Sequence, residues 1–499
     1  MSHAIFNRQI VLVILIGFID LSVMLGQGLE DALRYSLNQH TSTARSVGVA
    51  GVFNSVGADL SVANINPAGL AEFRRSEYTI SVGLGLKSNE GVHAGETTSQ
   101  SRTDVQLDNL AAVFVYDPPS FDVKSFNLAI GVNKLADFNQ DFSYRGQSSG
   151  TIVQRFLELS TGRTLDELDN FEGGLAYDAG AVYISDVTGD YETDFQTFSE
   201  VVMRSEDIER SGSHQEVYIA TATNIKNKFS LGFTLGIPII RYEENRTYRE
   251  SDELSSVDFF DRLRFEESLI TTGAGVNFKL GLLYKITPKV RFGLAVHSPS
   301  WLFLSDEFAS AMEYEITSNV TETFNSASPI SQFDYRIQTP WRATAGIGHI
   351  FRAGDIMGFV SGEVEVVDYT SSSLNLTVNS NNPLDQFFED DANNDINTQM
   401  QRALNFRLGA EIAYKKFRFR LGGSQTGDPF VNSNRATFDP QLSAGLGFRG
   451  NNNYIDVGFT RSVLNELYSP YALLNSAGEP IIENKLTRNR ISITYGSKF

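Results

Sequence analysis

TARSVGVAGVFNSVGADLSVANINPAGLAEF, residues Thr43 to Phe73, is the stretch of sequence that decides the fold. Gly48, Gly51 and Gly57 recur in it among small and apolar residues. Glycine permits close approach of the main chain and unusual dihedral angles, so this composition is typical of backbone packed inside another structure. The stretch therefore predicts a plug, and the rest of the chain is expected to form its container.

A short helix and then a break are expected within the plug. Asp59 to Ala63 can form the helix, and Asn66-Pro67-Ala68-Gly69 follows it. Proline disfavours the helical conformation in the residue before it, and glycine suits the turn that comes next. We call Asn66 to Gly69 the NPAG motif.

The glycine repeats, the acidic residue before the short helix and the NPAG motif resemble the N-terminal hatch of the FadL/TodX family of outer-membrane transporters. The resemblance implies a barrel with an internal hatch and passive uptake of hydrophobic compounds, such as long-chain fatty acids or hydrocarbons. In that family the ligand is captured among extracellular loops, moves to a pocket in the lumen, and leaves sideways after the hatch shifts. The alternative is a glycine-rich connector in some other exported protein.

The composition excludes several classes of protein. The chain has 499 residues, a formal net charge of -19 and no cysteine. The acidic balance argues against nucleic acid as a partner, because polyphosphate binding needs a basic face. The absence of cysteine excludes a disulfide framework, a thiolate zinc site and a cysteine nucleophile.

The N-terminus reads as a signal peptide over residues 1–26. Arg8 precedes an apolar run from Ile10 to Ile19, and Asp20 interrupts the run. Such a run is too short for a transmembrane helix, although an N-terminal anchor remains the alternative because no A-x-A cleavage site follows. Helical spacing from Leu29 to Leu37 then predicts a short amphipathic helix that leads into the plug. We expect the hatch to occupy residues 27–76.

From Tyr78 the apolar period changes to two. In EYTISVGLGL the apolar residues alternate with threonine, serine and glycine, which is typical of a strand with one lipid-facing side. The alternation returns along residues 77–499 and predicts an all-β fold, a transmembrane antiparallel barrel of about 14 strands. The final strand, Ile491 to Phe499, ends in an aromatic residue and resembles the signal that the barrel assembly machinery reads.

The connections between these strands alternate in length. Short ones such as Lys226 to Lys228 alternate with long polar insertions, which include Asn139 to His214, Arg241 to Ser268 and Leu302 to Gln332. Short turns on one side and long loops on the other are typical of an outer-membrane barrel. The first two insertions are strongly acidic, which departs from what fatty-acid capture would favour. We expect a monomer in a Gram-negative outer membrane, among membrane lipid and lipopolysaccharide.

Two sequence patterns of enzymes occur, and neither has the expected context. Gly146 to Gly150 satisfies G-x-S-x-G in a polar insertion, without the strand and helix of a nucleophile elbow. Gly445 to Gly450 satisfies G-x-G-x-x-G in an alternating strand, without a helix to bind phosphate. The acidic segment Glu389 to Asp395 lacks the glycine and the final glutamate of a calcium loop. The sequence therefore predicts no enzyme, no cofactor and no metal site, and the scattered His214, His297 and His349 are expected to be ordinary barrel residues.

The lumen is where a ligand is expected to bind. If the apolar residues face lipid, the alternate residues face inward. An amphipathic acid needs an apolar cavity with a cation for its carboxylate, so the candidate ligand-binding residues are Arg342, Arg407, Arg420 and Lys279. The alternative is that these cations pair with inward-facing glutamates across the wall.

Three other functions remain open at this point. A secretion-associated barrel of the same family, the PorV type, would use its loops to bind exported proteins. A general diffusion porin would conduct ions, which a plug opposes. An outer-membrane phospholipase is the enzymatic alternative, weakened by the lack of a convincing serine and histidine pair.

Overall fold

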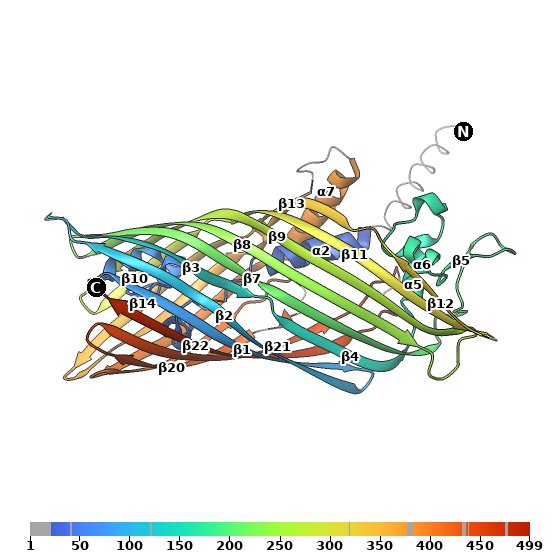
Figure 1. Cartoon of the computed structure of the whole chain (residues 1–499). Coiled ribbons are helices and arrows are strands. Elements are labelled where there is room, and N and C mark those ends of the chain that lie inside the picture. Colours follow the sequence, from blue (N-terminus) through green and yellow to red (C-terminus); the bar gives the residue numbers. More distant parts are fainter. Residues whose placement is uncertain are drawn as a thin grey trace.

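The computed structural model describes residues 21–39, 42–119, 122–318, 320–376, 383–431, 436–437, 439–474 and 478–499 (Figure 1). The predicted signal peptide lies outside the described residues as far as Asp20. Its remaining positions belong to helix α2 (Leu21–Arg34). The helix expected from Leu29 to Leu37 is part of α2 as far as Arg34. Among the described residues, no helix is both long enough and apolar enough to cross a membrane.

Fourteen antiparallel strands close into a barrel, which confirms the predicted fold class. The circuit closes where β1 pairs with β22 along almost the whole length of β1, from Glu77 opposite Lys498 to Val92 opposite Glu483. In order around the wall the strands are β1 (Glu77–His93), β2 (Glu96–Tyr116), β3 (Val123–Asp137), β7 (Val201–Ile225), β8 (Phe229–Ser251), β9 (Phe260–Lys285), β10 (Val290–His297), β14 (Trp341–Ala353), β15 (Ile356–Asp368), β17 (Arg402–Tyr414), β18 (Phe417–Thr426), β20 (Asp439–Arg449), β21 (Asn453–Tyr468) and β22 (Ile482–Lys498).

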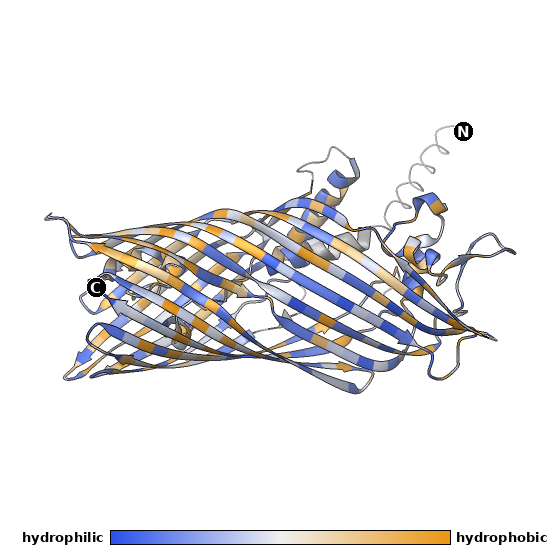
Figure 2. Ribbon diagram, viewed as in Figure 1, coloured by the Kyte–Doolittle hydropathy of each residue, from blue (hydrophilic) through white to orange (hydrophobic). Residues whose placement is uncertain are grey.

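The alternation of side chains gives the barrel an apolar outer band. In β1, Ile80 and Val82 are exposed while Thr79 and Ser81 are buried inside. Figure 2 shows the same alternation of apolar and polar residues along the strands. Aromatic side chains gather at the strand ends near the C-terminus, as in Phe229 stacked on Tyr284 and Phe417 against Phe448. An apolar band with aromatic borders is the surface that lipid requires of a barrel.

The insertions predicted as long loops are largely extensions of the sheet. They contain β4 (Gln140–Ser149), β11 (Trp301–Thr317), β12 (Thr321–Ala327), β13 (Ser331–Gln338), β16 (Ser373–Asn375), β19 (Ala436–Thr437) and the hairpin of β5 (Tyr183–Ile184) and β6 (Tyr191–Glu192). β7, β8, β9 and β11 rise together at the end opposite the C-terminus, and we call these extensions the tower (Figure 1). On the outside of the tower part of β7, Asp207 and Glu209 are exposed where the barrel has apolar residues. A polar outer face has no energetic cost where a strand is surrounded by water. The apolar alternation that predicts a strand is therefore weak in this part of the sequence.

Short helices pack on the inner face of the tower. α5 (Val153–Ser160) and α6 (Gly173–Asp178) bury apolar side chains against the tower strands, as Phe156 does against Phe265. The turns η2 (Leu165–Glu167) and η3 (Tyr369–Ser371) complete the connections. The acidic segment Glu389 to Asp395 lies within helix α7 (Pro383–Gln399), which packs beside α2.

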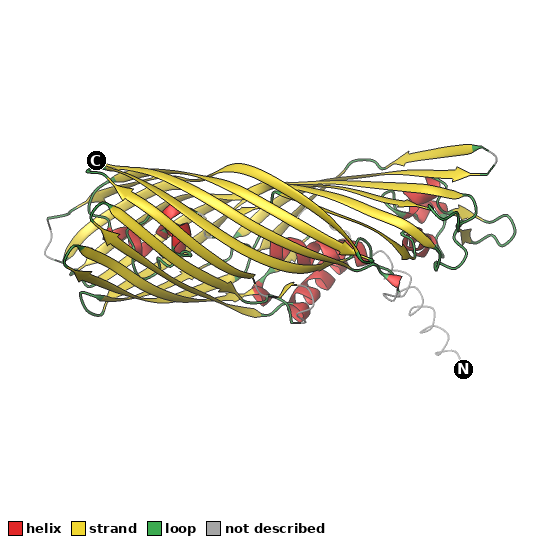
Figure 3. Ribbon diagram, turned by 90° about the horizontal axis from the view of Figure 1, so that it is seen from below, coloured by secondary structure: helices red, strands yellow, loops and turns green. Residues whose placement is uncertain are grey.

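The plug lies inside the barrel near the C-terminal end, where Figures 1 and 3 show its short helices enclosed by the strands. It consists of α3 (Ala44–Gly48), α4 (Val62–Ile65) and the 3-10 helix η1 (Pro67–Glu72). The helix predicted for Asp59 to Ala63 begins only at Val62. The Asp59 carboxylate accepts hydrogen bonds from the Ser61 amide at 3.0 Å and from the Thr43 hydroxyl at 2.8 Å, so Asp59 stabilises a turn before the helix.

Candidate functional site

The NPAG motif fixes the plug to one side of the barrel wall. Asn66 is extended, with φ -149° and ψ 99°, as its position before Pro67 predicts. Its side-chain amide donates to the carbonyl of Asn54 at 2.8 Å and to that of Leu282 in β9 at 3.1 Å. Its side-chain oxygen accepts from the Ala68 amide at 3.1 Å and caps η1. The motif is therefore a buried junction between plug and wall.

Glycines of the plug and of the wall allow this close packing. A Cβ on Gly69 would lie 3.0 Å from the Gly57 Cα, so neither position has room for a side chain. Gly57 also has a φ of 74°, which favours glycine. On the wall, Gly232 and Gly281 receive the NPAG motif without intervening side chains.

A second group of wall glycines receives the start of the plug. A Cβ on Gly48 would lie 3.1 Å from the Gly445 Cα, which leaves two backbones in direct contact. We call the group the glycine patch; it consists of Gly409, Gly422, Gly445 and Gly458, one from each of β17, β18, β20 and β21. The alternation in the sequence predicts that these glycines face inward, but only the structure shows that the plug covers them.

A chain of ion pairs ties the plug to the same wall. Arg45 of α3 donates to both carboxylate oxygens of Glu411, at 2.9 and 3.1 Å. Glu411 also accepts from Arg420 at 2.6 Å, and Arg420 in turn contacts Asp456 at 2.8 Å. The candidate Arg420 therefore has two carboxylates as partners and lies beneath the plug.

The other three candidates lie on a different part of the wall. Lys279, His297 and Arg342 stand directly opposite one another on β9, β10 and β14, and we call them the polar row. Arg407 lies farther round the wall on β17, where it contacts Glu363 at 3.7 Å and Glu365 at 3.4 Å. The strand register thus places Lys279 and Arg342 on either side of His297, which was expected from the sequence to be an ordinary barrel residue.

The polar row lies between the plug and the end of helix α2. His297 Nε2 lies 3.0 Å from the Ile65 carbonyl of the plug. Arg342 donates to the Ser36 carbonyl just after α2, and its distance to Glu365 is 3.9 Å. Lys279 is paired with Glu216. Arg342 thus has the longest carboxylate contact of the four candidate cations, and a main-chain carbonyl is its closer partner.

His214 lies near the polar row and was also assigned no role. It precedes Glu216, the partner of Lys279, by two positions on β7, so both side chains face the lumen. The His214 side chain is buried, and neither ring nitrogen has a hydrogen-bond partner among the described residues. This part of the lumen therefore holds an unsatisfied polar group beside several cations.

The wall opens along one line between β2 and β3. The two strands pair only from Tyr116 with Phe126 to Asn109 with Asn133. Above that point β4 bends inside the β1–β2 hairpin, where the Asn89 amide donates to the Asp141 carbonyl at 2.6 Å. We call this line the seam.

Charged side chains close the lumenal side of the seam. Lys134 contacts Asp108 at 2.9 Å and Lys87 contacts Asp137 at 2.9 Å, while Arg490 contacts both aspartates. The seam is thus an interruption of main-chain pairing that is held shut by ion pairs.

The two enzyme patterns lack catalytic geometry. Ser148 of Gly146 to Gly150 lies on strand β4, and its hydroxyl is 3.0 Å from His93 Nε2. This pair joins two strands, and no carboxylate orients the histidine ring among the described residues. Gly445 to Gly450 spans the end of β20 and the turn into β21. In the part of the chain that the structure describes, no group of histidine and acidic side chains is placed to hold a metal ion.

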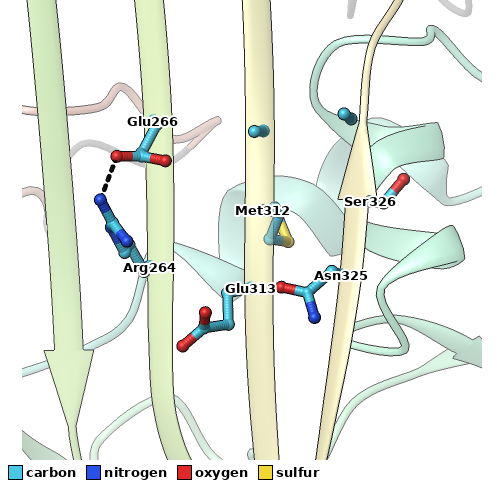
Figure 4. A pocket seen from close by; sticks show the side chains of 8 residues that line it. Arg264, Glu266, Met312, Glu313, Asn325 and Ser326 are labelled. Atoms are coloured by element: carbon cyan, nitrogen blue, oxygen red, sulfur yellow. Dashed lines mark hydrogen bonds and ion pairs between the residues drawn. The ribbon is translucent and has the colours of Figure 1, made fainter.

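A polar hollow of about 360 Å³ lies on the outer side of the tower (Figure 4). Arg264, Glu313 and Asn325 face it from β9, β11 and β12, and Arg264 contacts Glu266 beside it. The ion pair and the amide give this hollow the character of hydrated surface, unlike the apolar site that a hydrophobic ligand needs.

The fold is that of a FadL-type barrel. A FadL homologue of Pseudomonas aeruginosa superposes with a TM-score of 0.54 and 11% identity, over 93% of this chain and 100% of the other. The toluene transporter TodX of P. putida (TM-score 0.48, 11% identity) and TbuX of Ralstonia pickettii (TM-score 0.45, 14% identity) each align over 93% of this chain and 99% of their own. No protein-family model and no curated protein matches the sequence. The predicted resemblance is thus confirmed for the fold.

Proposed function

We propose that this chain is a monomeric outer-membrane channel for passive uptake of hydrophobic compounds, with the plug acting as a hatch. One observation carries the proposal: the plug, Thr43 to Phe73, lies in the lumen of an apolar-faced barrel and is held there by main-chain contacts and ion pairs. A water-filled porin has no use for such a plug. No nucleotide or energy-coupling motif occurs in the sequence, so movement follows the concentration gradient.

Arg342 is the residue that decides between an acidic and a neutral ligand. Its guanidinium reaches a main-chain carbonyl and has only a distant carboxylate, so the carboxylate of a fatty acid can replace the Ser36 carbonyl as its partner. Lys279 and Arg407 already contact glutamates, which offset their positive charge, so they are expected to contribute less to binding of a carboxylate than Arg342. Arg420 has a different role, because it holds the carboxylate that binds the plug.

The route out is proposed to be the seam. At the seam a ligand would have to separate ion pairs. Beyond Asn109 and Asn133, toward the tower, it would break no main-chain hydrogen bonds between β2 and β3. A short bismaleimide between Gln106→Cys and Lys134→Cys would tether its two sides, because these side chains already meet at 2.9 Å. The chain has no other cysteine. The tether is expected to stop uptake into cells while leaving ligand binding intact; unchanged uptake would place the exit elsewhere.

Binding of an octadecenoic acid and of a neutral alkane to the purified protein tests the ligand class. Arg342→Gln is expected to weaken fatty-acid binding by roughly 10- to 100-fold and to leave alkane binding unchanged, since one charge-assisted contact is lost. Arg336→Gln is the matched control, because Arg336 lies on the outside against Phe303. Alkane binding without fatty-acid binding in the wild type would assign a hydrocarbon channel, and binding of neither would contradict the proposal.

A further inference from the structure

The outer face of the barrel has an apolar hollow that none of the roles above uses. It measures about 510 Å³, within the range of small-molecule sites, and lies between β17, β18, β20 and β21. Its origin is a cross-strand row in which small and large side chains alternate: Ala410, Leu421, Ala444 and Phe459. The alanines form a depression that the bulky neighbours surround.

The wall beneath this hollow is only one backbone thick. Gly445 contributes to the floor of the hollow and also belongs to the glycine patch that receives the plug. At Gly445 neither face of the wall therefore has a side chain of its own, and Arg420 of the neighbouring strand also lines the hollow. Because the surrounding outward side chains belong to the apolar band, the only medium that reaches the hollow in a membrane is hydrocarbon.

A cation stands directly beyond the hollow. Arg461 follows Phe459 by two positions on β21, and both side chains are exposed on the outer face. At the rise of a β-strand this places Arg461 roughly 7 Å from Phe459, toward the tower. No carboxylate lies within ion-pair distance of Arg461 among the described residues, whereas Arg402 of β17 pairs with Asp368 at 3.0 Å. An unpaired arginine at the edge of an apolar band is suited to a phosphate.

We propose that the hollow and Arg461 form a binding site for a phosphorylated lipid of the outer leaflet, with one acyl chain in the hollow and a phosphate on Arg461. Lipid chains are as apolar as the wall, so the chain gains shape fit and little hydrophobic energy. Selectivity therefore comes from the phosphate. The inference rests on the proposed membrane setting and is independent of transport.

Native mass spectrometry of the detergent-purified chain with bis-phosphorylated lipid A tests this site. Ala444→Phe fills the hollow and Arg461→Gln removes the cation; each is expected to weaken binding by about tenfold. The matched controls are Ala274→Phe, at an exposed position of β9, and Arg241→Gln, at an exposed arginine of β8. Both are expected to bind like the wild type, and heat-modifiable migration shows whether each variant has folded.

Several outcomes would overturn the proposal. Equal binding by all variants would indicate a general lipid annulus. A loss in Arg461→Gln alone, with Ala444→Phe unaffected, would indicate surface charge attraction without a chain site. Equal binding of dephosphorylated lipid A would remove the role of Arg461. Fatty-acid binding is expected to be unchanged in both site variants, so a failure here is distinguishable from a failure of the proposed transport function.

Discussion

Replacing Arg45 with glutamine is expected to loosen the hatch without unfolding the barrel. Arg45 makes two hydrogen bonds to Glu411 and one to the Ala58 carbonyl at 2.7 Å. Its guanidinium also lies 4.9 Å from the centre of the Phe53 ring. All of these contacts join the hatch to itself or to the wall, and none joins two barrel strands. The substitution thus acts on docking alone.

The size of the effect depends on which contacts Glu411 keeps after Arg45 is replaced. A hydrogen bond to a charged group contributes about 1.5–3 kcal/mol. Glu411 retains Arg420 at 2.6 Å, so the full cost of about 3–5 kcal/mol for an unpaired buried charge does not arise. Since 18% of the Arg45 side chain is exposed, solvent screens part of the contact. We expect docking to weaken by about 2–4 kcal/mol, or roughly 30- to 700-fold in the docking equilibrium.

Hydrogen exchange across residues 44–58 and single-channel conductance measure this change. Faster exchange in the hatch and brief openings are expected, with the unfolding temperature of the barrel unchanged. Arg418→Gln is the matched control, because among the described residues Arg418 donates only to the carbonyls of Lys415 and Phe417, at 2.9 and 2.8 Å. Hydrogen exchange in the Arg45→Gln hatch that is as slow as in the wild type would refute the argument. Equally fast exchange in the Arg418→Gln hatch would refute it as well.

Three further predictions follow from individual contacts. Gly281→Val is expected to displace the NPAG motif, because a Cβ there overlaps the Asn66 side-chain oxygen; hatch exchange rates as slow as those of wild type would contradict this. Burial raises the pKa of Asp31 in α2 to about 7, so α2 docks more firmly as the pH falls from about 8 to about 5. Labelling of a Leu29→Cys variant slows accordingly, because the Leu29 side chain is buried in the docked helix. Asp31→Asn is expected to reduce that pH dependence, and an unchanged dependence would assign it to another group. Deleting Phe499, whose amide donates to the Ser76 carbonyl at 2.9 Å, is expected to lower the yield of assembled barrel in membrane fractions, and an unchanged yield would contradict the role of the last residue.

The sequence predicted the barrel because lipid imposes a simple pattern. In β1 one face meets hydrocarbon and the other packs against polar or small groups, so the alternation is plain. The tower strands obey the same geometry, but water on their outer face permits Asp207 and Glu209, and the apolar signal disappears. Alternation with buried tyrosines, such as Tyr242 and Tyr248 on β8, was the signal that remained.

The candidate site was less accessible to sequence reasoning. The inward direction of Lys279 and Arg342 followed from alternation, but their position across His297 depends on the register between three strands. Arg420 shares Glu411 with Arg45 of the hatch, which depends on where α3 comes to lie, and no local pattern encodes that position. The buried, unpartnered His214 likewise became visible only through its neighbours.

Native mass spectrometry of protein purified from outer membranes, with extraction of bound small molecules, tests the central claim most directly. Wild type is compared with a variant that lacks Gly28 to Ala71, which removes the second half of α2 and the plug as far as Ala71. We expect a bound fatty acid or hydrocarbon in the wild type and its loss from the variant. A wild type with no small ligand, and a protein partner bound in equal amount instead, would contradict the channel and favour a barrel that serves secretion.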